Sequence, residues 1–118
     1  TVVFINMFKK NERLSRPEFS DYFKKGTTHH FTHCTIITYP LPSLKVAVVV
    51  GKKVAKSAVQ RNVLKRRMYA QAKKDLEQHA YIGVVIIIAK SGYNALSRKE
   101  SNTILSHAIS VVCKKLST

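Results

Sequence analysis

Residues 81–90 read Y-I-G-V-V-I-I-I-A-K, and this stretch decides the fold. Its centre, residues 84–88, is an unbroken run of Val and Ile, the β-branched residues that favour strands. A strand with one face in water would alternate apolar and polar residues, whereas this run is apolar throughout. We therefore predict a strand that is buried on both faces and central in a sheet.

Two further strands are predicted upstream of this one. Residues 31–39 are rich in Thr, Ile and aromatic residues, and residues 44–50 read L-K-V-A-V-V-V, a second run suited to burial on both faces. Only a short loop containing Pro40 and Pro42 separates them. We expect these two strands to pair as an antiparallel hairpin.

Capping boxes mark the starts of two helices. Ser15 and Glu18 begin a short helix that Gly26 ends. Ser97 and Glu100 begin the last helix, whose broad apolar face predicts that it packs on the sheet.

A longer helix is predicted over residues 57–79, between the second and third strands. Apolar residues recur there at every fourth position and form one stripe: Leu64, Met68, Ala72 and Leu76. Four cations fall on the opposite half of the helical wheel: Arg66, Arg67, Lys73 and Lys74. Arg61 and Lys65 lie nearer the stripe, so we expect them to project past the edge of whatever the stripe covers.

The predicted fold class is α/β of the α+β type, in the order α-β-β-α-β-α. We expect one domain over residues 1–118, with a short N-terminal extension at about residues 1–12, and a small mixed sheet covered on one side by helices. At 118 residues with 45% hydrophobic composition, the chain can bury a core of its own.

Composition narrows the cellular setting. The longest apolar run, residues 83–89, is too short to span a bilayer, and the opening residues lack the features of a signal peptide. Cys34 and Cys113 form no C-x-x-C motif, which favours reduced thiols. These features predict a cytoplasmic protein without a membrane partner.

The strongest functional signal is the sequence K-K-V-A-K-S-A-V-Q-R-N-V-L-K-R-R at residues 52–67. It holds seven cations and no acid, within a chain of 21 Lys and Arg against 6 Asp and Glu and a net charge of +15. Unpaired positive charge destabilises a compact state unless a polyanion offsets it. The pattern predicts nucleic-acid binding rather than a solvated charged face. The candidate RNA-binding residues are Lys52, Lys53, Lys56, Arg61, Asn62, Lys65, Arg66 and Arg67.

Aromatic residues on the first helix suggest a second surface. Phe19 and Phe23 are four residues apart, so they share one helical face, and Lys24 and Lys25 follow them. Unpaired bases stack on such rings while cations follow the backbone. The alternative is that both rings belong to the core.

No motif indicates catalysis by the protein. The sequence H-H-F-T-H-C at residues 29–34 invites a metal interpretation, but on a strand its possible ligands would alternate between faces. We predict no metal ligand, no bound cofactor and no catalytic residue.

The stretch Q-R-N-V-L-K-R-R at residues 60–67 resembles the R-N-R-V-K-R signature of the protein subunit of bacterial ribonuclease P. The remaining motifs follow that family's order: R-L at residues 13–14, E-F at 18–19, K-K-G at 24–26, and V-V-I-I-I-A-K at 84–90. The resemblance covers nearly the whole chain. Four residues depart from the family's pattern: Ile37, Val63, Tyr69 and Ala70.

The resemblance implies a division of labour. A large RNA partner, ribonuclease P RNA, holds the Mg²⁺ ions that it requires and cleaves precursor tRNA to give the mature 5′ end. The protein, a monomer before assembly, docks on that RNA through the signature helix and its preceding loop. A cleft between the first helix and the sheet holds the 5′ leader, with Arg13, Phe19, Phe23 and Ile37 as candidate contacts. The resemblance also implies a left-handed βαβ crossover.

Two other functions fit the basic helix. One is a self-sufficient ribonuclease that uses two histidines as acid and base, for which His79 and His107 are candidates. The other is a general structural or ribosome-associated RNA-binding protein, which would need no leader cleft.

Overall fold

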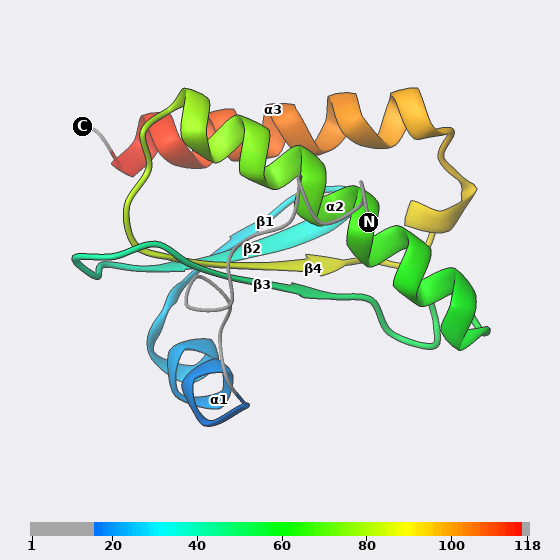
Figure 1. Ribbon diagram of the computed structural model, residues 1–118, viewed down its shortest axis with the longest axis horizontal. Helices are drawn as coiled ribbons and strands as arrows, with labels where there is room; N and C mark the ends of the chain where they lie inside the picture. The colour runs from blue at the N-terminus through cyan, green and yellow to red at the C-terminus, as the bar shows by residue number, and fades with distance from the viewer. Residues whose placement is uncertain (1–15, 117–118) are drawn as a thin grey trace, which may run out of the picture.

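The computed structural model describes residues 16–116, and its elements follow the predicted order with two additions (Figure 1). They are α1 (Arg16–Lys25), β1 (Thr27–His30), β2 (Cys34–Tyr39), β3 (Lys45–Val49), α2 (Ala58–Gln78), β4 (Val84–Ala89), the 3-10 helix η3 (Tyr93–Ala95) and α3 (Arg98–Leu116). The additions are η3 and β1, a polar strand without the apolar pattern that predicted the others. The N-terminal extension, the Ser15 cap and Arg13 lie outside the described residues.

The four strands form one mixed sheet in the order β1-β2-β4-β3. β4 is central, as predicted, and pairs antiparallel with β2 and parallel with β3. The predicted hairpin between β2 and β3 is therefore wrong, because β4 lies between them and β2 takes β1 as its second neighbour. A strand buried on both faces has no water to satisfy its backbone groups, so it gains most from a partner at each edge.

Helices cover both faces of the sheet. Figure 1 shows α2 and α3 above it and α1 below it. Alternation along β4 explains this, because Val85 and Ile87 face the larger core cluster and Val84 and Ile86 face a smaller one beside α1. The prediction that helices cover one side only is therefore wrong, since two apolar faces need two covers.

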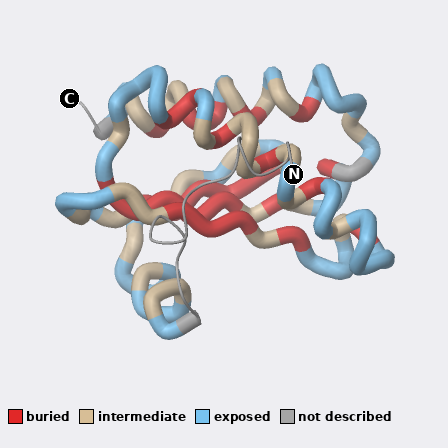
Figure 2. The backbone as a smooth tube through the Cα atoms, viewed as in Figure 1, coloured by how far each residue is buried: buried red, intermediate tan, exposed pale blue. Residues whose placement is uncertain are grey.

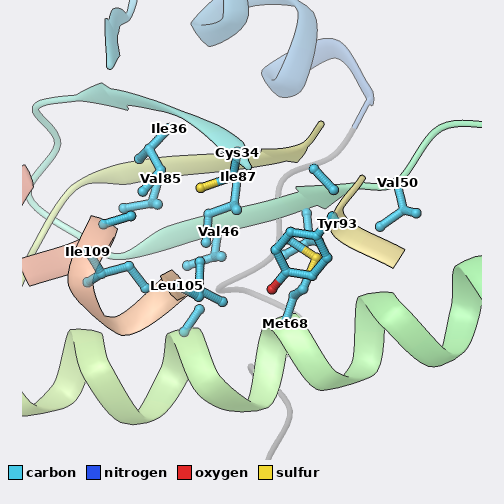
Figure 3. Close-up of a cluster of buried hydrophobic side chains, with 14 of the residues drawn as sticks. Cys34, Ile36, Val46, Val50, Met68, Val85, Ile87, Tyr93, Leu105 and Ile109 are labelled. Carbon is cyan, nitrogen blue, oxygen red and sulfur yellow. The ribbon is translucent and has the colours of Figure 1, made fainter. Parts of the chain in front are cut away.

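The larger core cluster joins the sheet to α2 and α3. The predicted stripe of α2 is buried, as are Leu105 and Ile109 of α3. Figure 3 shows Met68, Leu105 and Ile109 packed toward Val85 and Ile87 of β4. Figure 2 shows the same division along the chain, with buried residues on the sheet and on the sheet-facing sides of both helices.

The capping box of α3 is confirmed. The backbone N–H of Ser97 donates to Glu100 Oε1 at 3.0 Å, and the N–H of Glu100 donates to Ser97 Oγ at 3.1 Å. The first bond favours the ionised carboxylate and is the main cause that lowers the pKa of Glu100. The start of α3 is thereby fixed beside α2.

The connection from β3 through α2 to β4 joins neighbouring parallel strands. In Figure 1 both arrows point right, β3 lies in front of β4, and α2 lies above them. Seen with the helix toward the viewer and the strands pointing up, the chain moves to the left, so the crossover is left-handed. Nearly all βαβ connections are right-handed, which is why no local pattern could have predicted this one.

Candidate RNA-binding surface

The loop before α2 is held in a fixed shape. Two backbone N–H groups, those of Val54 and Ala55, donate to the carbonyl of Gly51 at 3.1 and 3.2 Å. Ala55 is buried and anchors the loop to the core. At the start of α2, Ser57 Oγ accepts from the N–H of Gln60 at 3.3 Å. The exposed lysines of this loop therefore extend from a defined backbone.

Arg61 connects the loop to the helix. Its Nη1 donates to the carbonyl of Lys56 at 2.8 Å and to that of Ala55 at 3.0 Å. Part of the Arg61 guanidinium is thus committed to positioning the loop, and its side chain is partly buried. This role differs from that of a free phosphate contact and was not predicted from the sequence.

Six cations belong to the loop before α2 and to the first half of α2. We call them the basic rim: Lys52, Lys53, Lys56, Arg61, Lys65 and Arg66. Asn62 and Arg66 are exposed on α2, and Lys65 is partly buried. Val59 and Val63 are exposed beside them. Val63 departs from the family signature and gives this face an apolar element in place of a cation.

Arg67 lies apart from the basic rim. Its Nη2 donates to Ser101 Oγ of α3 at 3.0 Å, and its Nε is a buried donor with no partner among the described residues. Arg67 was predicted on the half of α2 opposite the apolar stripe, and because α3 packs along that flank, its side chain is partly buried. Tyr69 also has a structural contact, since its hydroxyl accepts from the N–H of Val48 at 3.3 Å.

The surface at α1 contains the predicted aromatic pair. The rings of Phe19 and Phe23 have centroids 5.7 Å apart with planes tilted by 32°. Phe23 is 47% exposed, whereas Phe19 is half-buried against the smaller core cluster. Ile37 is only 3% exposed within that cluster, so its prediction as a direct leader contact is wrong.

A second aromatic pair lies next to the first and was missed in the sequence. The rings of Tyr22 and Tyr39 have centroids 5.2 Å apart, and both side chains are partly buried. Both tyrosines pack on the smaller cluster. Val49 and Ile88 pack on it too, and their side chains stay partly buried beside α1. The signal that could have found them is the alternation of β2 and β4, which predicts a second apolar face beside α1.

The histidines of residues 29–34 do not assemble a metal site, and His30 and His33 instead line one pocket with His107 of α3. β1 ends at His30 and β2 begins at Cys34, so the expected single strand is two strands joined by a turn. The His29 ring nitrogen lies 3.3 Å from Thr38 Oγ1, and burial is the main cause that lowers the pKa of His29. Among the described residues, no group of three His, Cys, Asp or Glu side chains could hold a metal ion.

Both cysteines are free thiols. Burial raises the pKa of Cys34 to about 11, so this thiol stays protonated and unreactive at neutral pH. Within residues 16–116, none of the helices has the length and apolar content needed to cross a membrane.

Comparisons with known proteins agree on one family. A family model described as Ribonuclease P matches residues 8–113. One solved structure, titled as a Staphylococcus aureus RNase P protein mutant with defective mRNA degradation activity, shares 19% identity and a TM-score of 0.74, covering 95% of this chain and 97% of that one. Another, the S. aureus RNase P protein at 2.0 angstrom, shares 18% identity and a TM-score of 0.70, covering 86% and 94%. No match was found among curated proteins.

Proposed function

The chain belongs to the ribonuclease P protein family, and from this premise we propose that it binds ribonuclease P RNA through the basic rim and the 5′ leader of precursor tRNA beside α1. Membership makes it the protein component of ribonuclease P, acting in tRNA processing with an RNA partner. Beyond family membership, the proposal assigns one protein surface to each of the two RNAs.

The observation that carries the docking assignment is the lack of compensating acid. Among residues 16–116, no carboxylate forms an ion pair with any member of the basic rim, whereas Lys25 pairs with Asp21 and Lys45 with Glu18. The rim also borders the N-terminus of α2, where helix N–H groups and the dipole favour anions. Phosphate groups supply the missing negative charge.

The leader assignment depends on Phe23. Its exposed ring can stack on an unpaired base, with Lys24 beside it to follow the backbone. Phe19 supports Phe23 from below at a centroid distance of 5.7 Å. Such a surface reads single strands with little sequence preference, which suits leaders of varied sequence.

We also propose that catalysis and its Mg²⁺ ions belong to the RNA, in the cytoplasm. The described residues offer no metal-ligand cluster. The two histidines of the competing ribonuclease hypothesis also lie apart. α2 and α3 run parallel, with Gln71 bonded to Ser106, so His79 lies about seven residues beyond the level of His107, or about 10 Å of helical rise.

The first test is single-turnover cleavage of a precursor tRNA that carries a 5′ leader. A bacterial ribonuclease P RNA is supplied at low Mg²⁺, with and without this protein. We expect the protein to accelerate cleavage, because its cations replace some of the screening that Mg²⁺ otherwise provides, and we expect no cleavage by protein alone.

Two outcomes would contradict the proposal. In the first, the RNA-free protein cleaves the precursor, and His79→Ala and His107→Ala abolish that cleavage. This result would support the histidine ribonuclease. Absence of acceleration by folded protein, together with equal affinity for precursor and mature tRNA in the complex, would favour a general structural RNA-binding protein.

We expect alanine substitutions of Phe19 and Phe23 to have different main effects, one on stability and the other on precursor tRNA affinity. Phe23→Ala removes an exposed ring, so we expect about fivefold weaker precursor affinity, at the low end of about 1–3 kcal/mol per stacked base, with stability nearly unchanged. Phe19→Ala opens a cavity in the smaller cluster and should mainly lower the free energy of unfolding.

The measurement is precursor and mature tRNA affinity in the assembled complex, with urea unfolding of each variant. Mature tRNA, which lacks the leader, is the control ligand. Equal losses for both tRNAs on Phe23→Ala would show that this ring does not bind the leader.

A further inference from the structure

A basic groove lies between α2 and α3, away from the basic rim. Its volume is about 690 Å³, and it is open to solvent. Its walls carry four cations: Arg67, Lys73, Lys74 and Arg98. Two amide side chains, Gln71 and Asn102, also line it, and Glu77 is its one carboxylate. We call it the α2–α3 groove.

Two of the lining side chains, Arg67 and Gln71, belong to a network of hydrogen bonds that joins the two helices. Arg67 Nη2 donates to Ser101 Oγ at 3.0 Å, and Gln71 Nε2 donates to Ser106 Oγ at 2.8 Å. Ser106 in turn donates to the buried carboxylate of Asp75 at 2.8 Å. These bonds hold the helices in register, so the groove has a preformed shape.

The charge and chemistry of the walls indicate an anion with many acceptor oxygens. Four cations exceed the single wall carboxylate by three charges, and Asp75 below them is already hydrogen-bonded by Gln71 and Ser106. Guanidinium groups and amides are suited to phosphate and hydroxyl oxygens. Arg67 is partly buried, and its low solvent access strengthens its positive potential in the groove.

The groove also lacks what single-stranded RNA requires. None of its lining residues is aromatic, so unpaired bases would find no ring to stack on. Double-stranded RNA is recognised differently, through phosphates and 2′-hydroxyls across its backbone. Cations and amides without aromatics therefore favour a helical RNA segment.

The basic rim next to the groove indicates which RNA the groove would bind. Arg66 of the basic rim and Lys73 of the groove are seven residues apart, so they lie almost on one line along α2, about 10 Å apart in rise. An RNA docked on the rim thus meets the groove without leaving the helix. We propose that the α2–α3 groove binds the sugar–phosphate backbone of a helical segment of ribonuclease P RNA, which extends the docking surface across α2. This inference rests on the proposed function.

The test compares neighbouring cations on α3. Arg98 lines the groove, whereas Lys99 is exposed next to it and does not. Lys74→Gln/Arg98→Gln removes two groove charges, and Lys99→Gln removes one charge outside it. Affinity for ribonuclease P RNA is measured over a range of salt concentrations. We expect the double variant to lower the salt slope by about two units, about one per contact, and Lys99→Gln to leave it nearly unchanged.

A competition arm tests the kind of RNA. A short RNA duplex and a single strand of equal length each compete for the wild-type protein and for the double variant. We expect the double variant to lose affinity for the duplex more than for the single strand. Lys74, Arg98 and Lys99 are all exposed, so we expect every variant to fold. Urea unfolding of each variant checks this.

The result that overturns the inference is a slope for Lys74→Gln/Arg98→Gln within error of that for Lys99→Gln. Greater loss of single-strand than of duplex binding would overturn it equally. Either result leaves the proposed function standing if wild-type protein still accelerates precursor cleavage, so the two failures are distinguishable.

Discussion

Gly26→Ala is expected to lower the free energy of unfolding by about 3 kcal/mol, the upper part of the range for overpacked sites. A Cβ at this position would lie 2.5 Å from Ile37 Cγ2, 2.8 Å from the carbonyl oxygen of Tyr22 and 2.9 Å from that of Thr38. Two of these atoms are backbone, so no rotamer change relieves the contact. The substitution must push α1 away from β2.

Displacing α1 also affects the leader surface. The N–H of Gly26 donates to the carbonyl of Tyr22 at 2.8 Å, so this residue both ends α1 and fixes its approach to the sheet. Phe19 and Phe23 move with the helix. We therefore expect the affinity for precursor tRNA to fall more than the affinity for ribonuclease P RNA, which meets the other end of the molecule.

Gly51→Ala is the matched control, because no atom lies within 4 Å of a Cβ there. Its free energy of unfolding should stay within about 0.5 kcal/mol of wild type. Urea unfolding and tRNA affinity are measured for both variants. Equal stability of the two would show that α1 can shift at little cost and that its close approach to β2 does not position the leader surface.

Gly26 illustrates what the sequence could and could not predict. Its position after an amphipathic run predicted the end of α1, because helix ends have local signals. Its contact with β2 depends on residues eleven and twelve positions later, which no local signal reports. For the same reason β4 was correctly predicted as central, while the pairing of β2 with β3 was wrong. An apolar run reports burial, whereas pairing is decided by strands distant in sequence.

The candidate sites also differ in whether they depend on local sequence or on contacts between distant segments. The basic rim could be predicted because charge without acid is visible in composition alone. Arg67 and Ile37 could not be placed, because one depends on α3 lying beside α2 and the other on α1 covering the second face of the sheet. The α2–α3 groove likewise joins two segments separated by β4, so the sequence showed its cations without showing that they meet.

Arg61 offers the sharpest separation of charge from geometry within the basic rim. Its Nη1 bridges the carbonyls of Ala55 and Lys56, which sets the direction of the lysines that precede α2. Arg61→Lys keeps the charge, but its shorter side chain ends in an ammonium that does not reach the position of Nη1, the one nitrogen that donates to both carbonyls. A hydrogen bond from a charged donor contributes about 1.5–3 kcal/mol. We expect a loss of about 2 kcal/mol of preorganisation, or about thirtyfold weaker affinity for ribonuclease P RNA.

The salt dependence then distinguishes the cause of that loss. If Arg61 acts by positioning the loop, Arg61→Lys weakens binding at every salt concentration while the slope stays that of wild type, because the number of phosphate contacts is unchanged. Arg66→Lys is the control, since Arg66 is exposed on the same helix and a lysine there can still meet a phosphate. Its affinity should stay within a few fold of wild type. Wild-type affinity for Arg61→Lys would mean that Arg61 contributes charge alone and that the loop is held by Gly51 and Ala55 without it.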